Sequence, residues 1–93
     1  MTSVNLTSTV SHIPNAVAAD VAGETVLMSL ERSRCYALGE IGSDIWLRLQ
    51  LPVRVGDLIV ELSGEYDAAP ELIEKDVLEL LTQLAEEGLI RVD

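Results

Sequence analysis

The stretch TVLMSLERSRCYALGEIGSDIW, residues 25–46, decides the fold because the spacing of its apolar residues changes partway along it. Before Gly39 it holds two runs of strand length, residues 25–30 and 34–38, which are rich in apolar and β-branched side chains. The polar residues 31–33 between them are typical of a turn between two strands. After Gly39 the apolar residues recur at helical spacing. The stretch therefore predicts two antiparallel strands that lead directly into a helix.

Upstream of this stretch the sequence predicts one more strand of the same sheet. Residues 17–21 are mostly apolar, and Ala22-Gly23 after them reads as a tight turn. Three short strands joined by such links form an antiparallel meander. Residues 1–15 form an N-terminal extension whose apolar residues have largely even spacing, which is compatible with a further strand: Val4, Leu6 and Val10.

Downstream, apolar residues at helical spacing predict three helices. The first runs along Ile41, Ile45 and Leu49 and stops before Pro52. The second covers residues 55–65. The third begins at Pro70, which suits a first helical position, and Gly88 is its expected C-cap.

Together these elements predict one α+β domain over residues 1–93, with residues 89–92 returning to pack on it. The expected architecture is a winged helix-turn-helix, in which a three-stranded antiparallel sheet is followed by three helices and the hairpin is the wing.

Net charge and the length of apolar runs indicate which partners and which location to expect. The chain has 93 residues with 16 Asp+Glu against 6 Lys+Arg, a net charge of -10, so binding to nucleic acid is disfavoured. No apolar run approaches the roughly 18 residues of a membrane span, and the polar start lacks a signal sequence, so a cytoplasmic location is expected. Residues 40–93 hold thirteen acids and four bases. A ligand along the third helix is therefore expected to meet a negative wall that favours basic residues.

The sequence contains few residues suited to catalysis or to metal binding. Cys35 is the only cysteine and His12 the only histidine, which excludes a disulfide framework and provides too few soft ligands for a structural zinc site. We expect Cys35 to be a half-buried strand residue and His12 to lie in a loop. The sequence thus predicts no enzyme, no metal and no cofactor.

Asp76 lies at the margin of the apolar stripe of the third helix. It either caps or pairs within the domain or accepts hydrogen bonds from a ligand.

Acyl and peptidyl carrier proteins are also small, acidic and helical. Their modified Ser follows an Asp at the start of a helix, whereas Ser43 precedes Asp44 here. Carriers also lack a first third that is rich in strands. The carrier class is therefore disfavoured.

Residues 17–92 resemble the PqqD-like family, the recognition elements for ribosomally made and modified peptides. The matching residues, in order, are Gly23 to Leu30, Tyr36 to Trp46, Tyr66-Asp67, Asp76-Val77 and Leu84 to Leu89. Two positions depart from the family pattern. Gly39 stands where Asn is usual, and Arg54 stands where a capping Ser or Thr is common, so the second helix is expected to begin less firmly.

The resemblance implies a winged-helix module without catalysis or cofactor. It implies binding of the leader segment of a precursor peptide and delivery to partner enzymes, namely a leader peptidase and a lasso cyclase or another modifying enzyme. In this family the leader adds antiparallel to the third strand, in the groove beside the third helix. The open edge of a three-strand meander independently favours such addition. The predicted contact residues are Arg34, Cys35, Tyr36, Ala37, Leu38, Asp76, Val77, Leu80, Leu81 and Leu84. Which of these leucines are core rather than contact stays open.

Two alternatives differ in ligand. A winged-helix transcriptional regulator needs a basic recognition helix, but residues 55–65 contain Asp57, Glu61 and Glu65 and no Lys or Arg. A protein-interaction adaptor uses the same strand edge and groove. Only binding data separate the adaptor from a leader-binding module.

Overall fold

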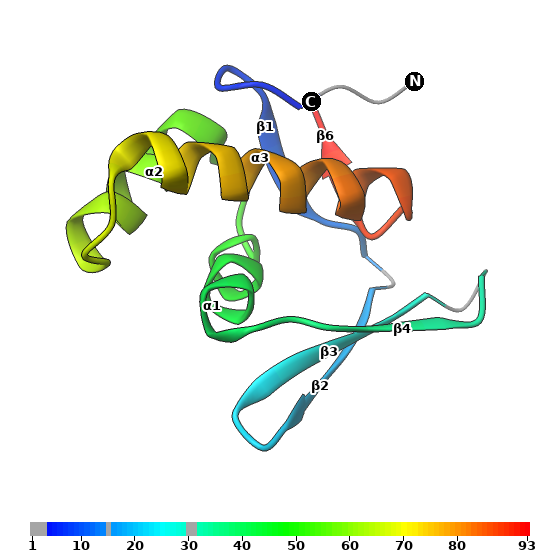
Figure 1. The fold of residues 1–93 in the computed structure, drawn as a ribbon. Helices are drawn as coiled ribbons and strands as arrows, with labels where there is room; N and C mark the ends of the chain where they lie inside the picture. The colour runs from blue at the N-terminus through cyan, green and yellow to red at the C-terminus, as the bar shows by residue number, and fades with distance from the viewer. Residues whose placement is uncertain (1–3, 15, 30–31) are drawn as a thin grey trace.

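The computed structural model describes residues 4–14, 16–29 and 32–93. In this part the chain forms an α+β fold, as predicted (Figure 1). Its elements are β1 (Thr9–His12), β2 (Val17–Val21), β3 (Glu24–Ser29), β4 (Arg34–Ala37), α1 (Glu40–Arg48), β5 (Val53–Arg54), α2 (Val55–Glu65), α3 (Pro70–Glu86) and β6 (Ile90–Val92). Outside the described residues lie residues 1–3 and Asn15, which belong to the predicted N-terminal extension, Leu30, the last residue of a predicted strand, and Glu31 of the predicted turn after it.

The strands form two antiparallel sheets, in the orders β2-β3-β4 and β5-β1-β6. The first is the predicted meander, and Ala22 and Gly23 make its tight turn with φ values of 54° and 85°. The second sheet was not predicted. Because β5 follows α1 and β6 follows α3, the expectation that all strands precede the helices is wrong. These two strands have two and three residues, too few to show a period in the sequence.

The N-terminal strand is shorter than its apolar spacing indicated. Only Thr9–His12 pairs with β5 and β6, while Leu6 lies in a turn and is exposed. The Asn5 side chain accepts the Thr7 backbone N–H at 3.0 Å and so holds this turn. The even spacing of Val4, Leu6 and Val10 therefore does not extend the strand before Thr9.

The core lies between the three helices and both sheets. Its largest fully buried side chains are Leu27, Leu49, Leu58, Leu62, Leu81, Val10, Val55 and Val77. Leu27 is the contribution of the β2–β4 sheet, which lies below α1 and α3 in Figure 1. Ile41 departs from its predicted place on the buried face of α1, since it is 46% exposed.

Arg48 ties α1 to α2. Its guanidinium donates to Asp44 at 2.9 Å and also contacts Glu61 and Glu65 of α2. The Tyr66 hydroxyl donates to the other Asp44 oxygen at 2.8 Å. The Arg48 guanidinium holds the pKa of Asp44 below its usual value, although partial burial opposes the shift. Asp44 and Tyr66, both part of the sequence pattern, therefore have a structural role in this network.

His12 joins β1 to α1. It lies in β1 rather than in the predicted loop, and its ring stacks on Trp46 with centroids 3.7 Å apart. Its Nε2 lies 2.5 Å from the Trp46 carbonyl oxygen, and its backbone N–H donates to Leu49 at 3.0 Å. Burial lowers the pKa of His12, and the hydrogen bond to Trp46 partly opposes this.

Acidification is therefore expected to weaken the fold through His12. A folded-state pKa below the unfolded value of 6.5 favours the neutral ring. The contribution is complete above 6.5 and is lost as pH falls through the lowered pKa. Urea unfolding followed by Trp46 fluorescence should give a decreasing midpoint between about pH 7.5 and 5. The decrease should be smaller in His12→Gln, and equal slopes in the two proteins would contradict this assignment.

Candidate functional site

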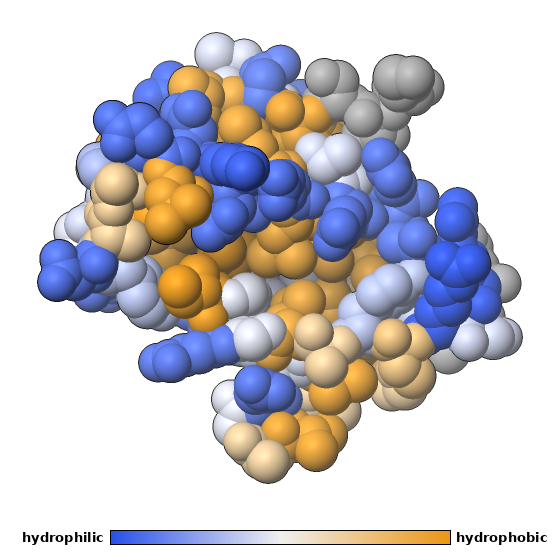
Figure 2. All heavy atoms as spheres, in the orientation of Figure 1, coloured by the Kyte–Doolittle hydropathy of each residue, from blue (hydrophilic) through white to orange (hydrophobic). Residues whose placement is uncertain are grey.

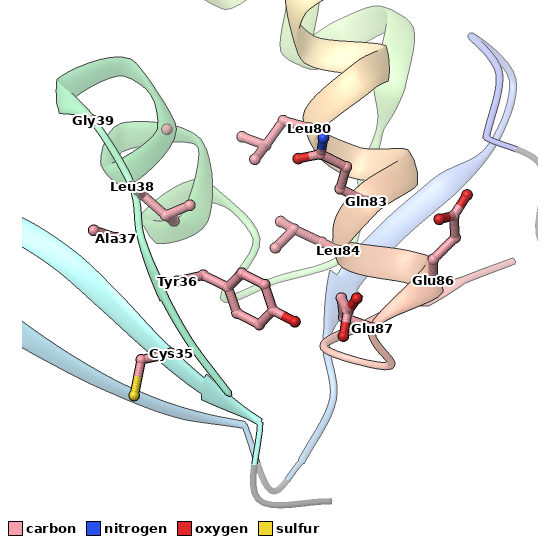
Figure 3. Close-up of a pocket in the computed structure, with 11 residues that line it drawn as sticks. Cys35, Tyr36, Ala37, Leu38, Gly39, Leu80, Gln83, Leu84, Glu86 and Glu87 are labelled. Carbon is pink, nitrogen blue, oxygen red and sulfur yellow. The ribbon is translucent and has the colours of Figure 1, made fainter. Parts of the chain in front are cut away.

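A groove of about 610 Å³ runs between β4 and α3. Figure 2 shows apolar residues in the hollow between α3 and the β2–β4 sheet. The groove is lined by Cys35, Tyr36, Ala37, Leu38, Gly39, Gly42, Leu80, Gln83, Leu84, Glu86 and Glu87 (Figure 3).

The β4 edge that borders this groove is an open sheet edge in the described part of the chain, where β4 pairs with β3 alone. Leu38 donates its N–H to Thr25, and the register then pairs Leu27 with Tyr36. Backbone groups in an antiparallel ladder point alternately to one neighbour and the other. The N–H and C=O groups of Cys35 and Ala37 therefore point away from β3, toward the open edge.

Side chains of β4 alternate between the two faces of the sheet. Tyr36 and Leu38 point into the groove, and the Cys35 sulfur points away from it (Figure 3). The prediction that Cys35 is half-buried is wrong, because its side chain is on the face away from the helices and is exposed. Cys35 and Ala37 thus offer mainly backbone to a ligand, whereas Tyr36 and Leu38 offer side chains.

The opposite wall is α3. Leu80 and Leu84 line the groove and face β4 (Figure 3); Leu80 is partly buried, whereas Leu84 is 3% exposed and also belongs to the core. Leu81, predicted as a contact residue together with them, is 0% exposed and belongs to the core. Adjacent residues of a helix point about 100° apart, so Leu80 can border the groove while Leu81 points into the core.

A second pocket of about 260 Å³ continues from the groove among the three helices. Its lining is Ile41, Gly42, Ile45, Leu62, Tyr66, Ala68, Leu72, Ile73, Asp76, Val77 and Leu80. Gly42 and Leu80 line both spaces. A Cβ atom at Gly42 would lie 3.2 Å from Leu38 Cβ, so glycine permits the close approach of α1 to Leu38 at this point.

The end of the groove near the start of β4 is polar. The Glu87 carboxylate forms two ion pairs: its Oε2 lies 3.6 Å from a guanidinium nitrogen of Arg32, and its Oε1 lies 3.6 Å from one of Arg34. The Tyr36 hydroxyl and Glu87 Oε2 are buried, and neither has a hydrogen-bond partner in the described part of the chain. The facing Glu87 carboxylate nevertheless raises the pKa of Tyr36; burial adds to this effect and Arg34 opposes it. This end of the groove therefore joins the Tyr36 hydroxyl, the Glu87 carboxylate and two arginines in one polar cluster.

Ser43 fixes β4 and β3 to the start of α1. Its buried hydroxyl accepts the Thr25 N–H at 2.9 Å and donates to the Leu38 carbonyl at 3.2 Å. Ser43, whose order relative to Asp44 disfavoured a carrier protein, thus has a structural role. It holds the end of the strand that borders the groove.

Replacing Ser43 by alanine should destabilise the fold by about 1–3 kcal/mol, because the Thr25 N–H, in a part-buried bond, and the Leu38 carbonyl, in a buried one, lose their partner. Urea unfolding measures this change. Ser63→Ala is the matched control, since the Ser63 hydroxyl is buried and has no partner in the described part of the chain. A loss in Ser43→Ala no greater than in Ser63→Ala would contradict the role of the bridge.

The structure brings most of the predicted site residues together. Cys35, Tyr36, Ala37, Leu38, Leu80 and Leu84 line the groove, and Asp76 and Val77 line the second pocket. Arg34 lies at the polar end through Glu87. The predicted site omitted Gly39, Gly42, Gln83, Glu86 and Glu87 of the groove. Helical spacing from Leu80 would have indicated Gln83 and Glu87, while Gly42 had no comparable signal.

The arrangement is suited to holding an extended chain, since it joins an open strand edge to an apolar trough. In the described residues no cluster of His, Cys, Asp and Glu could hold a metal ion. None of the described helices has the length and apolar character needed to cross a membrane.

Comparisons with known proteins agree with this geometry. Residues 24–90 match the family described as coenzyme PQQ synthesis protein D (PqqD). A solved structure described as TbiB1 in complex with the TbiA(beta) leader peptide aligns with a TM-score of 0.76 and 26% sequence identity. The alignment covers 87% of this chain and 94% of that one. No curated protein matches the sequence.

Proposed function

We propose that this chain, which belongs to the PqqD family, binds the leader segment of a ribosomally synthesised precursor peptide as an added antiparallel strand on β4. The family match confirms the resemblance predicted from the sequence. The proposed recognition unit is the whole of residues 1–93.

One observation carries the proposal: the open edge of β4 borders an apolar groove whose other wall is α3. An edge strand offers a ladder of hydrogen bonds to any extended peptide, and pockets beside it select side chains at alternate positions. The similar TbiB1 structure is a complex with a leader peptide, which supports a leader as the ligand here.

The proposed contacts follow the geometry of the groove. Cys35 and Ala37 bond to the peptide backbone, while Tyr36, Leu38, Leu80 and Leu84 contact its side chains. Asp76 and Val77 line the second pocket, which takes a side chain beyond the strand segment. Arg34 contacts the peptide at the polar end. Leu81 leaves the predicted contact set because it is fully buried in the core and lines neither the groove nor the second pocket.

The proposal extends to delivery of the bound leader. The module presents the leader to a leader peptidase and to a lasso cyclase or another modifying enzyme in the cytoplasm, and itself performs no chemistry. The make-up of the groove supports a binding role, since a backbone edge, apolar side chains and ion pairs are what peptide capture needs.

The same proposal assigns a winged-helix arrangement to the helical part. Its support is the order of elements, with β5 between α1 and α2 and β6 directly after α3. The sheet β5-β1-β6 then belongs to the winged-helix core, and the β2–β4 sheet, whose hairpin was predicted to be the wing, is instead the attachment that carries the peptide edge.

Fluorescence polarisation with labelled leader peptides tests this function. The probes are the TbiA(beta) leader and leaders from precursor genes that neighbour the gene for this chain. At least one neighbouring leader should bind with a Kd of about 1 μM or tighter, on the order of 8 kcal/mol. The proposal is overturned if none of these leaders shows saturable binding.

A further inference from the structure

We infer that the bound peptide carries an acidic residue four positions after an apolar one, in the pattern apolar-x-apolar-x-acidic from its N-terminal to its C-terminal end. The inference rests on the proposed strand addition and specifies which peptides the groove selects. The register of β4, the apolar walls of the groove and the arginines at its polar end together determine the pattern.

The register of β4 fixes which peptide side chains face the groove. An added strand bonds to the backbone of Cys35 and Ala37, which point to the open edge. Residues directly opposite each other in a sheet have their side chains on the same face. The peptide residues opposite Leu38, Tyr36 and Arg34 therefore face α3, and those between them do not. In an antiparallel strand these three residues occur in the order i, i+2 and i+4.

The first two positions meet apolar walls. Leu38 and Tyr36 face Leu80 and Leu84 across the groove (Figure 3). A side chain placed between these walls leaves water for an apolar surface, which favours an apolar residue. Positions i and i+2 of the peptide are therefore assigned apolar side chains.

The third position meets an excess of positive charge. Arg34 and Arg32 share one carboxylate, that of Glu87, at 3.6 Å each, and their side chains are 62% and 51% exposed. By contrast, Arg48 faces three carboxylates. Glu86 also lines the groove, but its carboxylate points away from Tyr36 in Figure 3. A peptide carboxylate opposite Arg34 would complete a cross-strand ion pair.

This location of charge revises the expectation from the sequence at one end of the groove. The excess of acids in residues 40–93 suggested a uniformly negative wall that attracts basic residues. Arg32 and Arg34 precede that segment in the sequence, yet they lie against the end of α3 through Glu87. The wall thus presents two exposed arginines where the C-terminal part of the bound segment leaves the groove.

Selection from a surface-displayed library of random peptides, of about twelve residues each, tests the inference. The wild-type chain should enrich apolar residues at i and i+2 and Asp or Glu at i+4. Arg34→Glu should shift the last preference to Lys or Arg. The matched control is Arg54→Glu, because Arg54 is similarly exposed and pairs with Asp57 on α2; it should leave the preference unchanged.

Synthetic versions of one selected peptide then give the magnitude. Changing its acid to Lys should weaken binding to the wild type roughly tenfold, and this loss should shrink in high salt. Binding to Arg34→Glu should show the reverse order. An absence of charge preference at i+4, a basic preference there, or an acid that instead precedes the apolar pair would overturn the inference.

The outcome is distinguishable from failure of the proposed function. Selected peptides are also measured against Ala37→Pro, which removes a hydrogen bond from the open edge. Peptides that lose binding to this variant but show no acidic preference overturn the inference and support strand addition. Peptides that bind Ala37→Pro as tightly as the wild type overturn both.

Discussion

The variant Ala37→Pro should lose leader binding by about a hundredfold while the domain stays folded. The N–H of Ala37 points to the open edge of β4, and proline has no N–H to donate. A peptide carbonyl left unpaired in the interface costs about 1–3 kcal/mol, and the ring would also collide with the incoming strand. Fluorescence polarisation with a leader that binds the wild type measures the loss.

The fold should tolerate this proline for the same geometric reason. Proline is accepted at edge strands where the missing N–H would face solvent. The ladder to β3 uses Tyr36 and Leu38 and not Ala37, and Tyr36 already has the extended backbone that a residue before proline requires. Thermal unfolding and far-UV circular dichroism should therefore remain close to those of the wild type.

Ala37→Val is the matched control for the proline variant. Valine keeps the N–H, favours strands, and has its side chain on the exposed face away from the groove. It should bind the leader within about threefold of the wild type. Equal binding by the proline and valine variants would show that the peptide does not add to β4.

The sequence was informative about the β2–β4 sheet and the helices because each is marked locally. Ala22-Gly23 marks the turn of the meander, and the period changes at Gly39. The second sheet has no local mark. Its strands β5 and β6 depend on pairing with β1, which lies more than forty residues before β5 in the chain. Such pairing is set by tertiary contacts that a short segment does not show.

The candidate site, like the fold, could be predicted only in part. The edge strand follows from its place at the end of the meander, so residues 34–38 could be assigned to it. The ion pairs of Arg32 and Arg34 with Glu87 join segments more than fifty residues apart, and no spacing rule reports them. The need for glycine at position 42 likewise depends on how closely α1 approaches Leu38 and Leu80.

For a related reason, the sequence did not distinguish the leucines of α3 that belong to the core from those that line the groove. A helical period identifies the apolar stripe of a helix but does not identify which elements pack against each side of that stripe. Here α3 packs on α2 and β6 on one side and borders the groove on the other. The boundary falls between Leu80 and Leu81, which makes these two residues the sharpest test of the structure.

Leu81→Ala should lower the free energy of unfolding by about 2–5 kcal/mol, because it opens a cavity at a side chain that is 0% exposed. Leu80→Ala should cost much less stability, since Leu80 is only partly buried, but should weaken leader binding about tenfold. Urea unfolding measures the first effect and fluorescence polarisation the second.

Each leucine variant serves as the control for the other, because the change in side chain is the same and only its direction from α3 differs. Under conditions where Leu81→Ala is still folded, it should bind the leader nearly as well as the wild type. A large binding loss in folded Leu81→Ala together with unchanged binding by Leu80→Ala would place the ligand elsewhere than the groove between β4 and α3. Opposite effects of adjacent leucines would instead separate the contribution of the core from that of the peptide site, which a stability measurement alone cannot do.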